Sequence, residues 1–164
     1  MGGTRAKLEA LGIEALGITE DSAEPVRIYY RIRPSKLRLA TDPKRDVHRR
    51  YGLPMPFYAG AYTQLRETTL TNPTGELPAP MSIPAGMKVL DERDGLVGMP
   101  EAKTVMDAFA KRDYAMHVGH FLVDRSGIVR WTWIESPSPE DISQYGRFPT
   151  DDEILAAVRA AGVS

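Results

Sequence analysis

Hydrophobic and polar positions alternate most clearly near residue 130 of this chain. The apolar run Phe121–Val123 leads into a polar segment that contains Asp124 and Gly127. Beyond that segment, apolar residues alternate with polar ones through Val129, Arg130, Trp131, Thr132 and Trp133. Strict alternation is typical of a strand with two different faces, and a short Asp- and Gly-containing segment is typical of a tight turn. The pattern therefore predicts a β-hairpin.

Elsewhere the pattern predicts helices that alternate with short strands. Helices are expected at residues 4–11, from a cap at Asp21 or Ser22 to about Arg33, at 42–52, from Pro100, and at 150–161. Strands are expected at 13–18, which is apolar enough to be buried, and at 37–40. Thr150 and Glu153 form a capping-box pattern at the start of the last helix. This order of elements indicates an α/β domain.

Residues 54–117 interrupt this order. Prolines recur from Pro54 to Pro84, and they break any long regular element. We expect an extended excursion up to about residue 82, with at most a short strand or a turn of helix. The whole chain, residues 1–164, is expected to form one domain that carries 54–117 as a long insertion.

Composition and charge narrow the classes of protein. The chain has 164 residues and 42% hydrophobic residues, enough for one compact core. Its formal net charge of -1 predicts neither a nucleic-acid nor a membrane partner. There is no signal-peptide pattern and no membrane-length apolar run, so the expected location is the cytoplasm. The chain has no cysteine, which excludes disulfides, thiolate metal sites and thiol catalysis by these residues.

Several blocks, taken in order, resemble a known family. They are residues 11–22, the Asp-Pro block of residues 39–52, the hairpin at 121–130, and the final helix. This series is similar to the peroxiredoxins of the alkyl hydroperoxide reductase/thiol-specific antioxidant family. The resemblance implies a thioredoxin-like, three-layer α/β fold without a bound cofactor. It also implies thiol-dependent peroxide reduction, an oxidoreductase and antioxidant activity, with a thioredoxin-like protein as electron donor.

The chain departs from the family at its start. In the family a central strand precedes the first helix, and that helix carries the reactive cysteine in its first turn. Met1 falls partway along the matching helix, so we expect an N-terminally incomplete fold: either Met1 is an internal methionine of a longer peroxidase, or the chain is a remnant. The missing strand would lie between residues 13–18 and 121–123. We therefore expect a homo-oligomer or a rearranged sheet, and the apolar stretch Met87–Leu90 is the best internal replacement.

The resemblance also places a few site residues. Gly119 takes the position of the thioredoxin cis-proline, and His120 follows it, so both are expected to bind substrate. Val118 stands where the family has the arginine that polarises peroxide. No catalytic residue is predicted. His117 and His120 are three apart in an expected strand and so point to opposite sides, which predicts partly buried histidines and no metal site.

Residues 27–50 hold many basic side chains: Arg27, Arg31, Arg33, Lys36, Arg38, Lys44, Arg45, Arg49 and Arg50. An anion-binding patch and a solvated helical face both explain them, and acidic residues elsewhere can balance them: Glu9, Glu14, Asp91, Glu92 and Asp94. Three hypotheses follow. The first is a peroxiredoxin-like protein that is inactive as it stands, the second a non-catalytic interaction or scaffold protein of the same fold, and the third a metal- or anion-binding protein.

Overall fold

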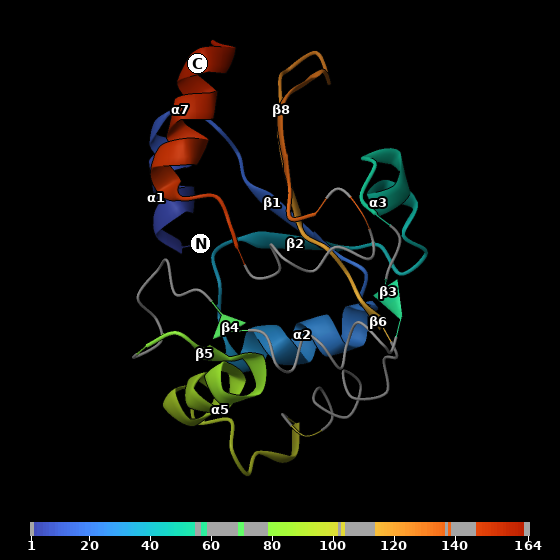
Figure 1. Cartoon of the computed structure of the whole chain (residues 1–164), viewed down its shortest axis with the longest axis vertical. Coiled ribbons are helices and arrows are strands. Elements are labelled where there is room, and N and C mark those ends of the chain that lie inside the picture. Colours follow the sequence, from blue (N-terminus) through green and yellow to red (C-terminus); the bar gives the residue numbers. More distant parts are fainter. Residues whose placement is uncertain are drawn as a thin grey trace.

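The computed structural model is a mixed α/β arrangement of helices and small two-stranded sheets (Figure 1). It describes residues 2–54, 57–58, 69–70, 79–101, 103, 114–136, 138 and 147–162. Within these ranges no helix is both long and apolar enough to cross a membrane. The α/β class predicted from the pattern is confirmed.

The first third of the chain follows the predicted order of elements. It runs through α1 (Gly2–Ala10), β1 (Leu16–Thr19), α2 (Ala23–Ile32), β2 (Arg38–Thr41) and α3 (Asp46–Arg50). β1 and β2 are parallel and α2 connects them, which makes a β–α–β unit. The chain leaves α1 through glycine at position 12, whose φ of 72° lies in the left-handed region.

The prediction of a buried strand at residues 13–18 is wrong in two respects. The strand begins only at Leu16, and its apolar side chains are exposed, Leu16 at 54% and Ile18 at 40%. Among the described residues β1 pairs only with β2. Parallel strands are normally covered on both faces, and that covering depends on elements remote in sequence. The apolar pattern therefore identified the strand but not its exposure.

The long insertion contains more regular structure than predicted. It holds β3 (Phe57–Tyr58), β4 (Thr69–Leu70), β5 (Met81–Ser82) and α5 (Ile83–Arg93), and near its end β6 (Tyr114–Ala115). β3 pairs with β6 and β4 pairs with β5, both antiparallel.

Two predictions concern the helices of this insertion. Met87–Leu90, the predicted replacement strand, lies inside α5, so that prediction is wrong. A short apolar run can belong to either element, and here Ser82 at the N-cap and a proline in the first turn begin a helix. Pro100, Glu101 and Lys103 are helical as predicted, while the rest of that predicted helix lies outside the described residues.

The last third contains the predicted hairpin and helix. β7 (Gly119–Val123) and β8 (Val129–Ile134) are antiparallel, and α7 (Asp151–Ala161) packs against β8. The Asp124 carboxylate accepts the N–H groups of Ser126 and Ile128, at 2.8 and 3.0 Å, and so shapes the turn. The capping box of Thr150 and Glu153 is present as predicted.

The first and last helices lie side by side, with both chain ends in that part of the molecule (Figure 1). Lys7 in α1 pairs with Asp151 at the start of α7, with 2.6 Å between Nζ and Oδ2, and Thr4 donates to the same carboxylate. The hydrogen bond from Lys7 holds the pKa of Asp151 below its usual range. Among the described apolar side chains, Leu122 in β7 and Val158 in α7 are the buried ones.

Candidate functional site at the base of the hairpin

The most deeply buried charged side chains lie where the hairpin opens. His117 precedes β7, Glu135 follows β8, and each is 2% exposed. Their side chains approach to 3.6 Å between His117 Nδ1 and Glu135 Oε2. A carboxylate that is shielded from solvent needs polar partners nearby, because a buried charge that loses its partner costs roughly 3–5 kcal/mol. One residue precedes the first strand of the hairpin and the other follows its second strand. The antiparallel pairing of the two strands brings them together.

Hydrogen bonds complete this contact. The N–H of Val118 donates to Glu135 Oε2 at 3.0 Å, and the N–H of Glu135 donates to the carbonyl oxygen of Val118 at 2.9 Å. We call His117, Val118 and Glu135 the hairpin clamp. His117 and Val118 directly precede β7 and Glu135 directly follows β8, so the clamp ties the two strands together at the end opposite the turn. Glu135 was not predicted as a site residue; an acid directly after an alternating strand was the only signal for it.

Gly119, one of the two predicted substrate-binding residues, lies at the start of β7 against apolar side chains. A Cβ atom there would come within 2.7 Å of Leu53 Cδ2 and 2.7 Å of Phe121 Cε2. Such contacts are too short for any real side chain. A side chain at this position would therefore force Leu53, which follows α3, or Phe121 to shift.

His120, the other predicted residue, faces a different set of side chains. Its ring makes edge contacts with Trp133, at 5.5 Å between centroids, and with Phe148, at 6.5 Å. Burial lowers the pKa of His120, and the nearby Glu135 charge offsets part of that effect. Nε2 of His120 is buried and makes no hydrogen bond within the part of the chain that the structure describes.

The two predicted residues therefore have different surroundings, and their substrate-binding role stays a prediction. Gly119 contacts Leu53 and Phe121 on one face of β7, while His120 contacts Trp133 and Phe148. Neighbouring residues of a strand point to opposite faces, which explains the divergence. The described ranges also contain no group of three or more His, Asp or Glu side chains placed to hold a metal ion.

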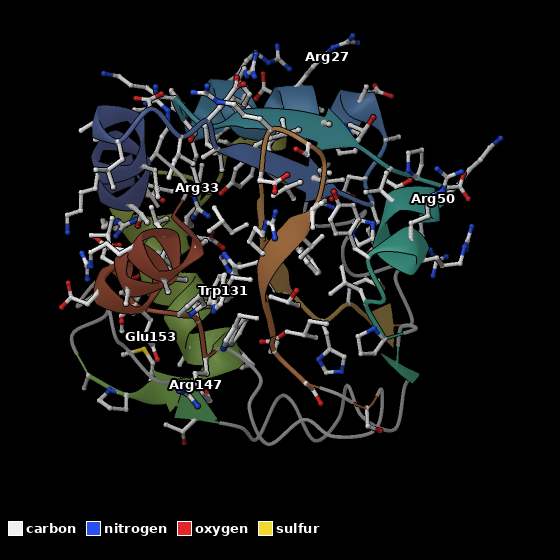
Figure 2. All side chains as sticks on the ribbon, turned by 90° about the horizontal axis from the view of Figure 1, so that it is seen from above. Arg27, Arg33, Arg50, Trp131, Arg147 and Glu153 are labelled. Atoms are coloured by element: carbon white, nitrogen blue, oxygen red, sulfur yellow. The ribbon has the colours of Figure 1, made fainter. Side chains whose placement is uncertain are left out.

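The two tryptophans of β8 are half-buried, so they pack against the protein and also meet its surface. Figure 2 shows Trp131 on the side of the hairpin that faces α7. Trp133 pairs across the hairpin with His120. Both placements favour packing within the protein over the stacking of a ligand.

A second polar centre, which the sequence did not predict as a site, joins β2 to α3. The buried carboxylate of Asp42 accepts the N–H groups of Asp46, Val47 and His48 at 2.9, 2.9 and 3.1 Å, and His48 Nδ1 lies 2.8 Å away. Burial alone would raise the pKa of Asp42, but the bonds from His48 and the backbone hold it below its usual range. Asp42 thus caps α3 and orients the His48 ring.

Within the part of the chain that the structure describes, acidic side chains form ion pairs with only some of the basic side chains at 27–50. Arg33 reaches Asp91 at 2.9 Å and Asp94 at 2.6 Å, and Arg38 pairs with Glu14. These pairs agree with the predicted balance. The same prediction is wrong for two other acids, since Glu9 pairs with Arg5 and Glu92 with Lys88.

Comparison with known proteins found no match for this chain. No protein-family model matches the sequence, and no curated protein or solved structure matches it significantly. The described residues contain buried acid–histidine pairs but no cysteine. The arrangement at the hairpin base can hold a proton and fix two strands, and it offers no thiolate nucleophile.

Proposed function

We propose that this chain is a peroxiredoxin-like protein of thioredoxin fold, and that residues 1–164 supply the scaffold without the reactive thiolate. One observation carries the proposal. A parallel β1–α2–β2 unit is followed later in the chain by an antiparallel β7–β8 hairpin and a packed C-terminal helix, the order that the family uses. In this proposal the two sheets are outer parts of one larger sheet.

The unpaired edges support this proposal. Among the described residues β1 pairs only with β2, and β7 pairs only with β8. A strand added between β1 and β7 would pair with the remaining edge of each and give the order β2–β1–added strand–β7–β8. Three or more strands are generally needed for an independently stable sheet, and the added strand would also cover Leu16 and Ile18.

Peroxide reduction in this proposal needs a cysteine from outside the given residues, with a thioredoxin-like protein as electron donor. The decisive experiment compares two proteins. The 164-residue chain should consume no peroxide with a thioredoxin system above a no-protein blank. A protein extended by a strand and a helical turn that bear a cysteine should turn over peroxide at about 1 s⁻¹ or faster.

The control is the same extended protein with that cysteine changed to serine, which should be inactive. Activity of the 164-residue chain alone would overturn the proposal. So would an extended protein that carries the cysteine, folds, and still fails to consume peroxide.

The second candidate is a non-catalytic interaction protein of the same fold. The exposed apolar side chains of β1, Leu16 and Ile18, favour it, because apolar strand edges pair readily with other chains. It predicts a homo-oligomer whose mass by light scattering is a multiple of 18.2 kDa. A stop codon directly upstream of Met1, with no cysteine in any extension, would favour this candidate over the first.

A further inference from the structure

The ring of His120 contacts two aromatic side chains that come from different parts of the chain. Trp133 is its partner in the register of the hairpin, with 5.5 Å between the ring centroids. Phe148 approaches from the segment just before α7, with 6.5 Å between the ring centroids. Figure 2 shows Arg147, the neighbour of Phe148, on the side of the hairpin where α7 lies. His120 is therefore a point at which the residues before α7 contact the hairpin.

These surroundings suit the neutral form of the His120 ring. Nε2 of His120 is buried, and within the described part of the chain it makes no hydrogen bond. A neutral imidazole tolerates such a place, because one of its two nitrogens carries a lone pair and no proton. An imidazolium carries an N–H on both nitrogens, and it is costly to bury one of them without an acceptor. The contact with Phe148 therefore favours the unprotonated ring.

Charged groups around this contact oppose the burial only in part. Burial lowers the pKa of His120 from 6.5, and the negative charge of Glu135 offsets some of that effect. The neighbouring elements carry further titratable or charged groups: His117 before β7, Arg147 before α7, and Asp151, Asp152 and Glu153 in the first turn of α7. His117 lies 3.6 Å from Glu135, and Arg147 lies 3.8 Å from Glu153. Burial therefore decides the direction, and protonation of His120 favours any state in which its ring meets water.

We propose that the contact between His120 and Phe148 is acid-sensitive, so that protonation of the histidine releases Phe148 and the residues before α7 from the hairpin. In the closed state the neutral ring packs against both aromatic side chains. In the open state water solvates the imidazolium, and Phe148, which is already 41% exposed, no longer covers it. If the open ring titrates at the ordinary value of 6.5, the ratio of open to closed molecules rises by up to about tenfold between pH 7.5 and pH 5.5. This device goes beyond the proposed redox scaffold and does not depend on it.

The first test measures the pKa of His120 in the whole 164-residue chain, by NMR titration of the histidine ring protons. In the unchanged chain this pKa should lie below 6.5. Phe148→Ala should raise it towards 6.5, because the ring loses part of its cover. Glu135→Gln should lower it further, because the favourable negative charge is lost. An unchanged pKa in Phe148→Ala, or a pKa of 6.5 or higher in the unchanged chain, would overturn the proposal.

The second test uses the reciprocity of this coupling. If Phe148 opposes protonation of His120, then protonation must weaken the packing of Phe148 by the same factor. The destabilisation caused by Phe148→Ala, measured by urea denaturation, should therefore be smaller at pH 5.5 than at pH 7.5. In a His120→Phe background it should be the same at both pH values, since phenylalanine does not titrate. An equal destabilisation at both pH values with His120 present would contradict the coupling.

Tyr51→Leu is the matched control for Phe148→Ala. Tyr51 is an aromatic residue of similar exposure, 37%, but it contacts Phe121, with 4.7 Å between the ring centroids. Phe121 follows His120 in β7 and so points to the opposite face of the strand. Tyr51→Leu should therefore leave the pKa of His120 unchanged. An equal rise in Tyr51→Leu and in Phe148→Ala would mean that general loosening of the fold controls the ring, and the proposal would fail.

Discussion

The β7–β8 hairpin and the β1–β2 pair are both two-stranded sheets, but their side chains differ in how they are paired and exposed. The hairpin closes itself at both ends, through the Asp124 turn and through the clamp of His117 and Glu135. The β1–β2 pair leaves Leu16 and Ile18 exposed on its first strand. The hairpin is thus held together at both ends by side chains of its own segment, whereas two apolar side chains of β1 stay exposed. This difference supports our proposal that β1 is one strand of a larger sheet.

The strongest test of this comparison removes the clamp. Glu135→Ala should lower the free energy of unfolding by about 3 kcal/mol, because it removes the acceptor of the Val118 N–H and the carboxylate beside the buried His117. Urea denaturation followed by tryptophan fluorescence measures the loss, since both tryptophans lie in β8. Glu135→Gln is the control. It retains an oxygen acceptor for Val118 and should lose clearly less, and equal losses in the two variants would contradict the clamp.

A pair of leucine truncations compares the two sheets directly. Leu122→Ala should cost about 3 kcal/mol, because Leu122 is buried in β7. Leu16→Ala should change stability by less than about 0.5 kcal/mol in the monomeric chain, because this side chain is 54% exposed. A large cost for Leu16→Ala in a protein that light scattering finds monomeric would mean that β1 is already covered.

A substitution at Gly119 tests how closely β7 packs against the turn after α3. Gly119→Ala should destabilise the chain by about 1–3 kcal/mol, because its Cβ would meet Leu53 and Phe121 at 2.7 Å. The double variant Gly119→Ala/Leu53→Ala should recover part of that loss, since it removes one of the two contacts. Denaturation midpoints of the three proteins measure it. No loss in the single variant would show that the strand and the turn after α3 are not in direct contact.

The smallest effects should appear on acidification, and they should touch both regions. Backbone hydrogen bonds, above all from the N–H of Ile128, hold the pKa of Asp124 low. Hydrogen bonds from His48 and from the backbone hold the pKa of Asp42 low, although burial alone would raise it. A lowered pKa in the folded state means that the stabilisation is present above the ordinary value of 3.8 and is lost as pH falls below it.

The denaturation midpoint should therefore fall below about pH 4. It should already begin to fall below the ordinary histidine value of 6.5, because burial lowers the pKa of His120 and the folded state resists protonation of its ring. Asp124→Asn should flatten the fall below about pH 4 in part, because asparagine keeps an acceptor oxygen but does not titrate. A midpoint that rose on acidification would contradict the assigned role of both carboxylates.

The elements that the sequence predicted well are those with local signals. The Asp124–Gly127 turn, the alternation along β8, and the Thr150–Glu153 capping box each lie within a few residues and each was found. The exposure of β1 depends on elements remote in sequence, and it was not predicted. Met87–Leu90 was predicted wrongly for another reason: a short apolar run fits a strand or a helix, and the start of α5 at Ser82 makes it helical.

The candidate site was predicted even less completely, for the same reason. Glu135 contacts a residue 17 positions earlier, and no local pattern marks that pairing. Gly119 and His120 were predicted from the position that the family resemblance gives them in the fold. Strand geometry turns these two neighbouring residues toward opposite faces of β7.

The most direct measurement for the central comparison is amide hydrogen exchange of the 164-residue chain, read residue by residue. The account predicts slow exchange in β7 and β8 and exchange at least tenfold faster in β1, because β1 has few buried contacts to hold it closed. Exchange in β1 should slow towards the hairpin rate in a protein that supplies the added strand. Equal exchange rates for β1 and β7 in the monomeric 164-residue chain would contradict the account.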